Sequence, residues 1–387
     1  NLAVARDHLE RYGGRAPGVD GHTFDMLTAG EWWEGLRLFR DEIQSGEYAP
    51  ARDLLRQIPK GSGRGTRTIA VQTLTDRVVG RAALQVLQPV LDRFFDPLSF
   101  GGRPGRGVFD ALAAATHLYE RGHTVWVAED LRDAFGRVPL PRLLDVAAKS
   151  LGIKNRRTDR LYAFLKSVVS GASVPGLRQG NPLSPFLMNV FLDHHLDRRW
   201  RKAHPRWPLL RYIDDLLVVC PSRAEAREAH AALVETLVPA GMLTKLGPGR
   251  SVRSLDARRP VQWLGFAVYR SRAGGLRILP GERAWDGLAE ALSEPGLTPD
   301  RAAAVIRGWV GAMGPCYPHA GRRSAYEHLA ALAGACGAGV TPGPDEVEGW
   351  WQLAYVRWQR RCRRAIRELN SAGRFALPDQ RRPVHNR

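Results

Sequence analysis

Apolar residues recur at helical spacing through several stretches of the chain, most clearly at residues 77–95, where valine, alanine and leucine lie three or four positions apart. Shorter stretches repeat the pattern, and Gly/Pro pairs interrupt it beyond residue 280. Helices are therefore expected at residues 77–95, 141–151, 157–170 and 223–238, within 280–340, and at 346–369. No internal repeat accompanies them, which argues against a solenoid.

Three short apolar runs predict β-strands instead. Residues 124–130 form a β-rich run that closes on Asp130, and residues 261–268 form another. Between them, residues 209–220 are apolar at both ends with two acids at the centre, a pattern typical of a β-hairpin whose turn carries Asp214 and Asp215. Strands and helices in this order indicate an α+β fold, with an antiparallel sheet backed by helices.

The charge of the chain points to a class of binding partner. Its 57 Lys and Arg residues exceed its 39 Asp and Glu residues by 18. Only six of the basic residues are lysines, so a compositional preference for arginine explains the type of residue but not the excess of positive charge. Ten of the arginines follow residue 355, against two acids. Because the electrostatic field of a strongly positive chain attracts polyanions, the sequence predicts nucleic-acid binding.

Cysteine spacing and hydropathy argue against other classes of protein. The cysteines, Cys220, Cys316, Cys336 and Cys362, lie far apart without a CxxC pair, which disfavours a zinc site and fits thiols in a reducing cytosol. No apolar run reaches the roughly 18 residues of a membrane-spanning helix, and the first residues lack the apolar core of a signal peptide. A cytoplasmic protein without a membrane partner is therefore expected.

Asp130 and the pair Asp214-Asp215 are the candidate catalytic residues. Carboxylates at strand ends of one sheet can converge, and they then repel one another unless a cation lies between them. Mg²⁺ binds carboxylate and phosphate oxygens together, and two such ions about 3.5–4 Å apart can activate a hydroxyl and stabilise a pyrophosphate leaving group. An Asp-Asp turn by itself is more often solvated, so the interpretation depends on the rest of the chain.

Eight short motifs give that context. They are residues 16–21 (APGVDG), 58–67 with 75–79 (TDRVV), 99–106 (SFGGRPGR), 129–135 (EDLRDAF), 176–185 (GLRQGNPLSP), 211–215 (RYIDD), 263–266 (WLGF) and 306–309 (IRGW). In this order they resemble the blocks of the group II intron family of reverse transcriptases, over residues 1 to about 309. Each motif is weak by itself, but eight in the right order are a strong signal.

The resemblance implies a right-hand polymerase fold, with fingers, a palm that contains the antiparallel sheet, and a helical thumb. It places the N-terminal part of the fingers at residues 1–122, the palm with interleaved fingers elements at 123–272, the thumb at 273–345, and a basic C-terminal helix and tail at 346–387. It also implies an RNA-directed DNA polymerase that extends a primer 3′ end with dNTPs on RNA or DNA templates. Two Mg²⁺ ions would be the cofactors, and Mn²⁺ could substitute for them. A homodimer is compatible with the resemblance.

Individual roles follow from the same resemblance. It gives the catalytic and metal-binding roles to Asp130, Asp214 and Asp215, adds the backbone carbonyl of Leu131 as a metal ligand, and makes Asp133 a rival to Asp130. The expected nucleotide-binding residues are Lys60, Arg67, Phe135, Gln179 and Gly180. Of these, Phe135 resembles the steric gate that crowds a 2′-hydroxyl. The expected template and primer contacts are Arg103, Arg106, Tyr212, Ile213, Trp263, Leu264 and Gly265.

Two departures from the family pattern bear on the biological role. Ile213 stands where most group II enzymes have alanine, and it resembles a stand-alone class associated with bacterial DNA repair. The family's lysine after the Asp-Asp hairpin, a candidate proton donor to pyrophosphate, is matched by Lys245 or Arg250, and the sequence leaves the choice open. No endonuclease is expected. Repair of double-strand breaks through short complementarities is favoured, with a maturase-like splicing cofactor and a phage-defence enzyme as alternatives.

Overall fold

The computed structural model of the protein describes residues 1–14, 16–59, 66–170, 174–256, 258–371 and 373. The α-helices are α1 (Leu2–Tyr12), α2 (Ala29–Ser45), α3 (Leu74–Leu91), α4 (Val108–Glu120), α5 (Leu140–Ser150), α6 (Arg160–Ser170), α7 (Ser184–Leu192), α8 (Arg198–Ala203), α9 (Arg223–Leu237), α10 (Pro248–Ser251), α11 (Glu282–Leu292), α12 (Pro299–Ala312), α13 (Arg322–Ala335) and α14 (Pro344–Ser371). The strands are β1 (Leu54–Pro59), β2 (Thr66–Val71), β3 (Val125–Asp130), β4 (Leu209–Tyr212), β5 (Asp215–Cys220), β6 (Val252–Ser254), β7 (Val261–Trp263), β8 (Phe266–Arg270) and β9 (Leu276–Pro280).

A four-stranded antiparallel sheet, in the order β4-β5-β3-β6, forms the centre of the molecule. Along its strands successive side chains enter opposite cores: Val127 and Val218 belong to one hydrophobic cluster, and Trp126 and Leu217 belong to the other. Because both faces are buried, the strands read as continuous apolar runs rather than as alternating ones. The sheet therefore presents its polar residues at its ends and not on a face.

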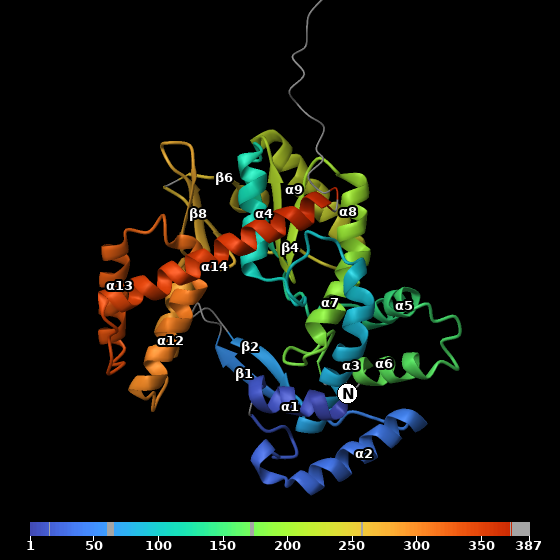
Figure 1. Cartoon of the computed structure of the whole chain (residues 1–387). Helices are drawn as coiled ribbons and strands as arrows, with labels where there is room; N and C mark the ends of the chain where they lie inside the picture. The colour runs from blue at the N-terminus through green and yellow to red at the C-terminus, as the bar shows by residue number, and fades with distance from the viewer. Residues whose placement is uncertain (15, 60–65, 171–173, 257, 372, 374–387) are drawn as a thin grey trace, which may run out of the picture.

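Helices cover both faces of this sheet. Side chains of α5, α6, α7 and α9 complete the cluster that contains Val127. Side chains of α4 and of α11 to α14 join the cluster that contains Trp126. In Figure 1, α4 lies beside the central strands and α14 runs across it toward α12 and α13. The expected antiparallel sheet backed by helices is confirmed.

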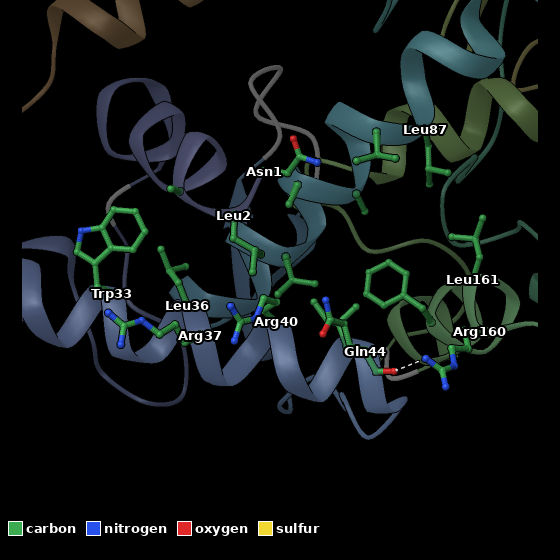
Figure 2. Close-up of a pocket in the computed structure, with 17 residues that line it drawn as sticks. Asn1, Leu2, Trp33, Leu36, Arg37, Arg40, Gln44, Leu87, Arg160 and Leu161 are labelled. Carbon is green, nitrogen blue, oxygen red and sulfur yellow. Dashed lines mark hydrogen bonds between the residues drawn. The ribbon is translucent and has the colours of Figure 1, made fainter.

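The first part of the chain has a small core of its own. Residues of α1, α2 and α3 form this cluster, and the β1-β2 hairpin lies beside it (Figure 1). Between α2, α3 and α6 is an apolar groove of about 610 Å³. Figure 2 shows Arg37, Arg40 and Arg160 around it, with the Arg160 guanidinium donating to the carbonyl of Gln44 at 3.2 Å.

Helix α14 joins the C-terminal helices to the central part of the molecule. Arg361 and Arg364 of α14 form ion pairs with the buried carboxylate of Asp110 in α4, at 2.9 and 3.4 Å. Both guanidinium groups also donate to the carbonyl of Gly105. Two of the arginines that the sequence assigned to a nucleic-acid-binding tail are thus bound to the protein itself.

Most expected elements are present within a few residues. The helices expected at residues 77–95, 141–151, 157–170, 223–238 and 346–369 are α3, α5, α6, α9 and α14, and residues 280–340 contain α11, α12 and α13. Helix α3 begins at Leu74, earlier than expected, because the Thr73 hydroxyl accepts a hydrogen bond from the Asp76 backbone N–H and caps the helix.

The single strand expected at residues 261–268 is wrong. The chain turns back at Leu264 and Gly265, whose φ angles are 50° and 84°, so that β7 and β8 form a hairpin. Two successive positive φ angles are those of a type I′ turn, which matches the twist of the paired strands. The short strand β6 has no counterpart in the sequence pattern, because three residues are too few to give a period.

Two expected domain limits also cut through packed units. The limit at residue 272 divides the β7-β8-β9 sheet, since β9 pairs with β8 along its length. Helix α4 was placed with the fingers, yet its Leu112 lies in the same core as Trp126 of the central sheet. Among the described ranges, no helix is long and apolar enough to cross a membrane.

Candidate active site

Strand pairing brings the three candidate carboxylates together. Asp130 ends β3 and Asp215 begins β5, and the two residues are direct partners in the antiparallel register. The Asp214 carbonyl accepts a hydrogen bond from the Leu131 backbone N–H at 3.2 Å. Asp214 lies in the two-residue turn of the β4-β5 hairpin, as expected. Asp215 was also expected in the turn, but it is the first residue of strand β5. Two sequence segments 84 or 85 residues apart therefore meet at one end of the sheet.

Burial and neighbouring carboxylates raise the pKa values of Asp214 and Asp215. Burial, with the charges of Asp130 and Asp214 in addition, raises the pKa of Asp215 from 3.8 to about 7. Burial and the charge of Asp130 also raise the pKa of Asp214. Arg283 of α11 and Lys245 oppose this rise at Asp215. A buried group of like charges with raised pKa values is stabilised when a cation binds to it.

Lys245 supplies a cation within the protein. Its ammonium group lies 2.7 Å from Oδ2 of Asp130. The segment that carries it is fixed by backbone hydrogen bonds, from Lys245 N–H to the Asp130 carbonyl at 2.9 Å and from Arg132 N–H to the Leu243 carbonyl at 2.8 Å. Of the two residues that the sequence left open, Lys245 therefore forms an ion pair with Asp130. Arg250 lines a cleft that also contains Asp130 and Asp215.

Two clefts meet at these aspartates. The larger, of about 960 Å³, is lined by Thr66 and Thr68 of the β1-β2 hairpin, by residues 130–136, by Gln179 and by Arg283 of α11. The smaller, of about 440 Å³, contains Asp130, Asp215 and the β7-β8 turn. Parts of the chain expected as fingers, palm and thumb thus border one continuous site.

Comparison with known proteins agrees with this arrangement. Residues 58–268, more than half of the chain, match the family "Reverse transcriptase (RNA-dependent DNA polymerase)". The chain belongs to the reverse transcriptase family. Its α+β architecture is accordingly that of a right-hand polymerase, as the sequence predicted.

Individual relatives cover only parts of the reverse transcriptase chain. Protein YkfC of Escherichia coli K12 is 34% identical over 220 residues, which are 52% of this chain and 56% of YkfC. The group II intron-encoded protein LtrA of Lactococcus lactis is 27% identical over 172 residues, 43% of this chain and 28% of LtrA. The chain therefore spans little more than half of YkfC and less than a third of LtrA. Apo telomerase of Candida tropicalis aligns with a TM-score of 0.47 at 11% identity, over 86% of this chain and 72% of that one.

Phe135, the expected steric gate of the reverse transcriptase, lies in the larger cleft. It is half-buried, and its backbone carbonyl accepts a hydrogen bond from the Leu177 N–H at 2.8 Å. The loop approaches so closely at Gly176 that a Cβ there would overlap the carbonyl oxygens of Phe135 and Gly136. Only glycine fits at this position, so Gly176 fixes the loop against the Phe135 turn.

Gln179 lines the same cleft, and Gly180 follows it against the fingers strand β2. The Gln179 carbonyl accepts a hydrogen bond from Ala70 N–H of β2 at 3.2 Å. A Cβ on Gly180, whose φ is 114°, would stand 3.3 Å from the Ala70 carbonyl oxygen. Gly180 therefore makes its close approach to strand β2. Gln179, the residue before it, lines the cleft.

The two fingers cations are only partly placed. Arg67 lies in β2, opposite Ile58 of β1, at the backbone level. Lys60 lies outside the described residues. Their expected contact with an incoming triphosphate stays a prediction.

The hairpin β7-β8 presents Trp263, Leu264 and Gly265 to the smaller cleft. Tyr212 is half-buried opposite Asp215 in the hairpin register, and burial together with the Asp215 charge raises its pKa. Trp263, Leu264 and Gly265 thus line a different cleft from the one that the fingers hairpin borders.

Ile213 has an unusual conformation in the turn that carries Asp214. Its φ is 57°, a value that costs a β-branched residue about 1–3 kcal/mol. Its side chain lies against the backbone of Gly101 and Gly102: a Cβ on Gly102 would stand 2.8 Å from Ile213 Cδ1. The isoleucine thus packs on a glycine pair of the protein, and its contact with a primer stays a prediction.

The expectation that Arg103 contacts template phosphates is wrong. Its guanidinium is buried and donates to both carboxylate oxygens of Asp92 and to the carbonyls of Asp92, Asp96 and Ser99. Every N–H of the group is used in this way. Arg106 is partly enclosed, donates to the carbonyl of Pro97 at 2.6 Å and faces Glu368 of α14 at 3.9 Å.

Sequence reasoning missed several residues of the site. Arg283 of α11 shares the smaller cleft with Asp215 and opposes the rise in its pKa through charge, and no motif marks it. Glu129, beside Asp130, is buried and accepts hydrogen bonds from the Leu246 N–H at 3.0 Å and from His230 of α9, whose Nε2 lies at 2.9 Å. The apolar run that precedes Glu129 was the available signal, since a buried acid in a strand needs partners.

Proposed function

We propose that this protein is a DNA polymerase that extends a primer 3′ end with dNTPs on RNA and DNA templates. One observation carries the proposal: Asp130, Asp214 and Asp215 converge at the junction of two clefts, each bordered by elements from separate parts of the chain. A template-primer end and an incoming nucleotide need such a junction, because the 3′-hydroxyl and the triphosphate must meet at the metal-binding carboxylates.

The donor set fits magnesium. Carboxylate and carbonyl oxygens are the ligands that Mg²⁺ prefers, and Asp130, Asp214, Asp215 and the Leu131 carbonyl would hold the ions. Within the described ranges, no three His, Cys, Asp or Glu side chains are grouped as a ready-made metal site, and one oxygen of Asp130 is paired with Lys245. When bound, two Mg²⁺ ions would favour the deprotonated 3′-hydroxyl and stabilise the pyrophosphate leaving group.

The protein's own groups have separable roles around that chemistry. Lys245, whose ammonium lies beside Asp130, would neutralise charge on the leaving pyrophosphate. Phe135 would lie under the sugar of the incoming nucleotide and exclude a 2′-hydroxyl. The turn at Trp263, Leu264 and Gly265 would hold the primer strand on the opposite side of the aspartates.

The test is primer extension on matched RNA and DNA templates. Asp130→Asn and Asp214→Asn should each lower the rate by orders of magnitude, while template-primer affinity stays close to that of the wild type, because a metal ligand serves the transition state more than ground-state binding. Asp133→Asn is the matched control. It changes a carboxylate of the same cleft at a φ of 48°, which asparagine tolerates.

The outcomes separate the candidate functions. Loss of extension in the Asp133 variant but not in the Asp130 variant would show that Asp133, and not Asp130, is the metal-binding carboxylate of this segment. Wild-type protein that binds template-primer yet does not extend it would indicate a binding protein, such as a splicing cofactor.

For the biological role we propose repair of DNA ends that share short complementarities, on the strength of Ile213. The comparison is wild type against Ile213→Ala over a series of primer lengths. Selective loss of extension from primers paired over a few bases would support this role, and parallel curves would contradict it.

A further inference from the structure

The turn that presents Asp214 needs a partner to hold it. Tyr212 and Asp215 pair across the hairpin, so Ile213 and Asp214 are its two central residues. Among the described residues, positive φ angles outside glycine occur at Asp133, Ile213 and Leu264, and therefore not at Asp214. A two-residue turn with a positive φ only at its first central position is of type II′, where glycine is preferred. Isoleucine does not favour the positive φ that this position requires, so other contacts must hold it there.

Arg211 lies directly beneath this turn. Its side chain is 1% exposed, and its Nη1 donates a hydrogen bond to the Ile213 carbonyl at 3.0 Å. The same guanidinium forms a bidentate ion pair with Asp197, with Nη2 2.6 Å from Oδ2. Asp197 ends a segment of π-helix, Asp193–Asp197, which follows α7. Such segments are rare and are frequent at functional sites.

Asn189 of α7 joins this group to the other side of the turn. Its amide oxygen accepts a hydrogen bond from Arg211 Nη1 at 2.6 Å, and its amide nitrogen donates to the Gly101 carbonyl at 2.8 Å. The Gly101-Gly102 segment in turn lies against Ile213, since a Cβ on Gly101 would stand 2.7 Å from the Ile213 backbone nitrogen. One buried set of hydrogen bonds therefore holds both the carbonyl of Ile213 and the surface on which its side chain rests.

We propose that Arg211, held by Asp197, is a positioning residue for Asp214. The Ile213 carbonyl belongs to the peptide group that leads into Asp214, so fixing that carbonyl fixes the direction in which the Asp214 side chain leaves the turn. Neither Arg211 nor Asp197 lines the clefts at the aspartates. The charge of Arg211 also opposes the rise in the pKa of Asp214, but the effect proposed here passes through the backbone of Ile213, and it rests on the polymerase function proposed above.

A single substitution would not test this, because removing one partner leaves a buried charge unpaired and unfolds many proteins. The test variant is Arg211→Met combined with Asp197→Leu, which removes both charges and keeps the volume apolar. Its midpoint of thermal unfolding establishes that it is folded. In this double variant, no guanidinium group holds the Ile213 carbonyl, so Ile213 can leave its positive φ angle. We expect kcat for primer extension to fall between about five- and a hundredfold, with template-primer affinity and KM for dNTP changed less than about threefold.

The decisive variant adds Ile213→Gly to that pair. Glycine adopts a positive φ without support, so kcat should recover most of what the pair alone loses, to within about threefold of the wild type. In the wild-type background the same change should not raise kcat. Asp133→Gly, the matched control, relieves a positive φ elsewhere in the site and should give no recovery.

A second measurement separates this proposal from the function on which it rests. Binding of Mn²⁺, followed by electron paramagnetic resonance without substrates, should weaken about tenfold in the Arg211/Asp197 pair and recover on Ile213→Gly. Wild-type protein that binds Mn²⁺ without extending a primer would overturn the polymerase function but not the positioning. A folded pair variant with wild-type kcat and Mn²⁺ affinity, or a loss that glycine does not restore, would show that Arg211 and Asp197 only stabilise the fold.

Discussion

Neutralising Asp215 should stabilise the metal-free protein, by an amount that grows with pH. Burial, with the charges of Asp130 and Asp214, raises the pKa of Asp215 from 3.8 to about 7. The folded protein therefore keeps this proton through a pH range in which the unfolded chain releases it. Because the folded state binds more protons between about pH 4 and pH 7, the free energy of unfolding falls as pH rises through that window.

The size of the effect follows from the two pKa values. A rise from 3.8 to about 7 corresponds to at most about 4 kcal/mol, at about 1.4 kcal/mol per pH unit. Below about pH 4 both states hold the proton and the cost is absent, whereas above about pH 7 it is complete. Since the three carboxylates interact, the titration belongs to the cluster, and the measured midpoint is that of the group.

The assay is urea unfolding of the wild type and Asp215→Asn in EDTA, over about pH 5 to pH 8. Asparagine keeps the shape of the side chain and removes its charge. The difference in the free energy of unfolding should increase steadily with pH, toward about 4 kcal/mol at pH 8, and Mg²⁺ at pH 8 should reduce it by stabilising only the wild type. A difference that does not change with pH would mean that Lys245 and Arg283 already neutralise the cluster.

Three further variants test other parts of the site. Phe135→Ala should admit ribonucleotides about tenfold better or more, measured as the ratio of kcat/KM for dNTP and rNTP; an unchanged ratio would place the gate elsewhere. Lys245→Met should slow extension and tighten Mn²⁺ binding, because its ammonium no longer competes for Asp130 Oδ2 at 2.7 Å. Arg250 lines the smaller cleft but is not the residue paired with Asp130, so Arg250→Met should leave Mn²⁺ affinity unchanged. Gln at the exposed arginines 357, 360, 363 and 367 of α14 should make the salt dependence of template affinity shallower by about 0.7–0.9 per lost phosphate contact. Gln at Arg361 and Arg364, which bind Asp110, should instead lower the free energy of unfolding and leave that slope unchanged.

The sequence by itself determined the elements and the acids at their ends. Apolar spacing located α3, α5, α6, α9 and α14, because a helix with one buried face must repeat every three or four residues. The runs before Asp130 and around Asp214 and Asp215 marked strands whose ends carry charge. These are short-range properties, since each depends on the neighbours of a residue along the chain. The ordered motifs then indicated the family, and with it the fold.

Only the tertiary structure decided which charged side chains serve the site. Lys245 and Arg250 lie five residues apart, yet of the two it is Lys245 that forms an ion pair with Asp130, 115 residues away along the chain. Arg103, in a family motif, is buried on Asp92, whereas Arg283, in no motif, comes to Asp215. A long charged side chain is tolerated at many positions, so its sequence context does not fix its partner. That partner is set by how helices and strands pack, because packing determines whether the charge ends in water, on a buried carboxylate or at the acidic cluster.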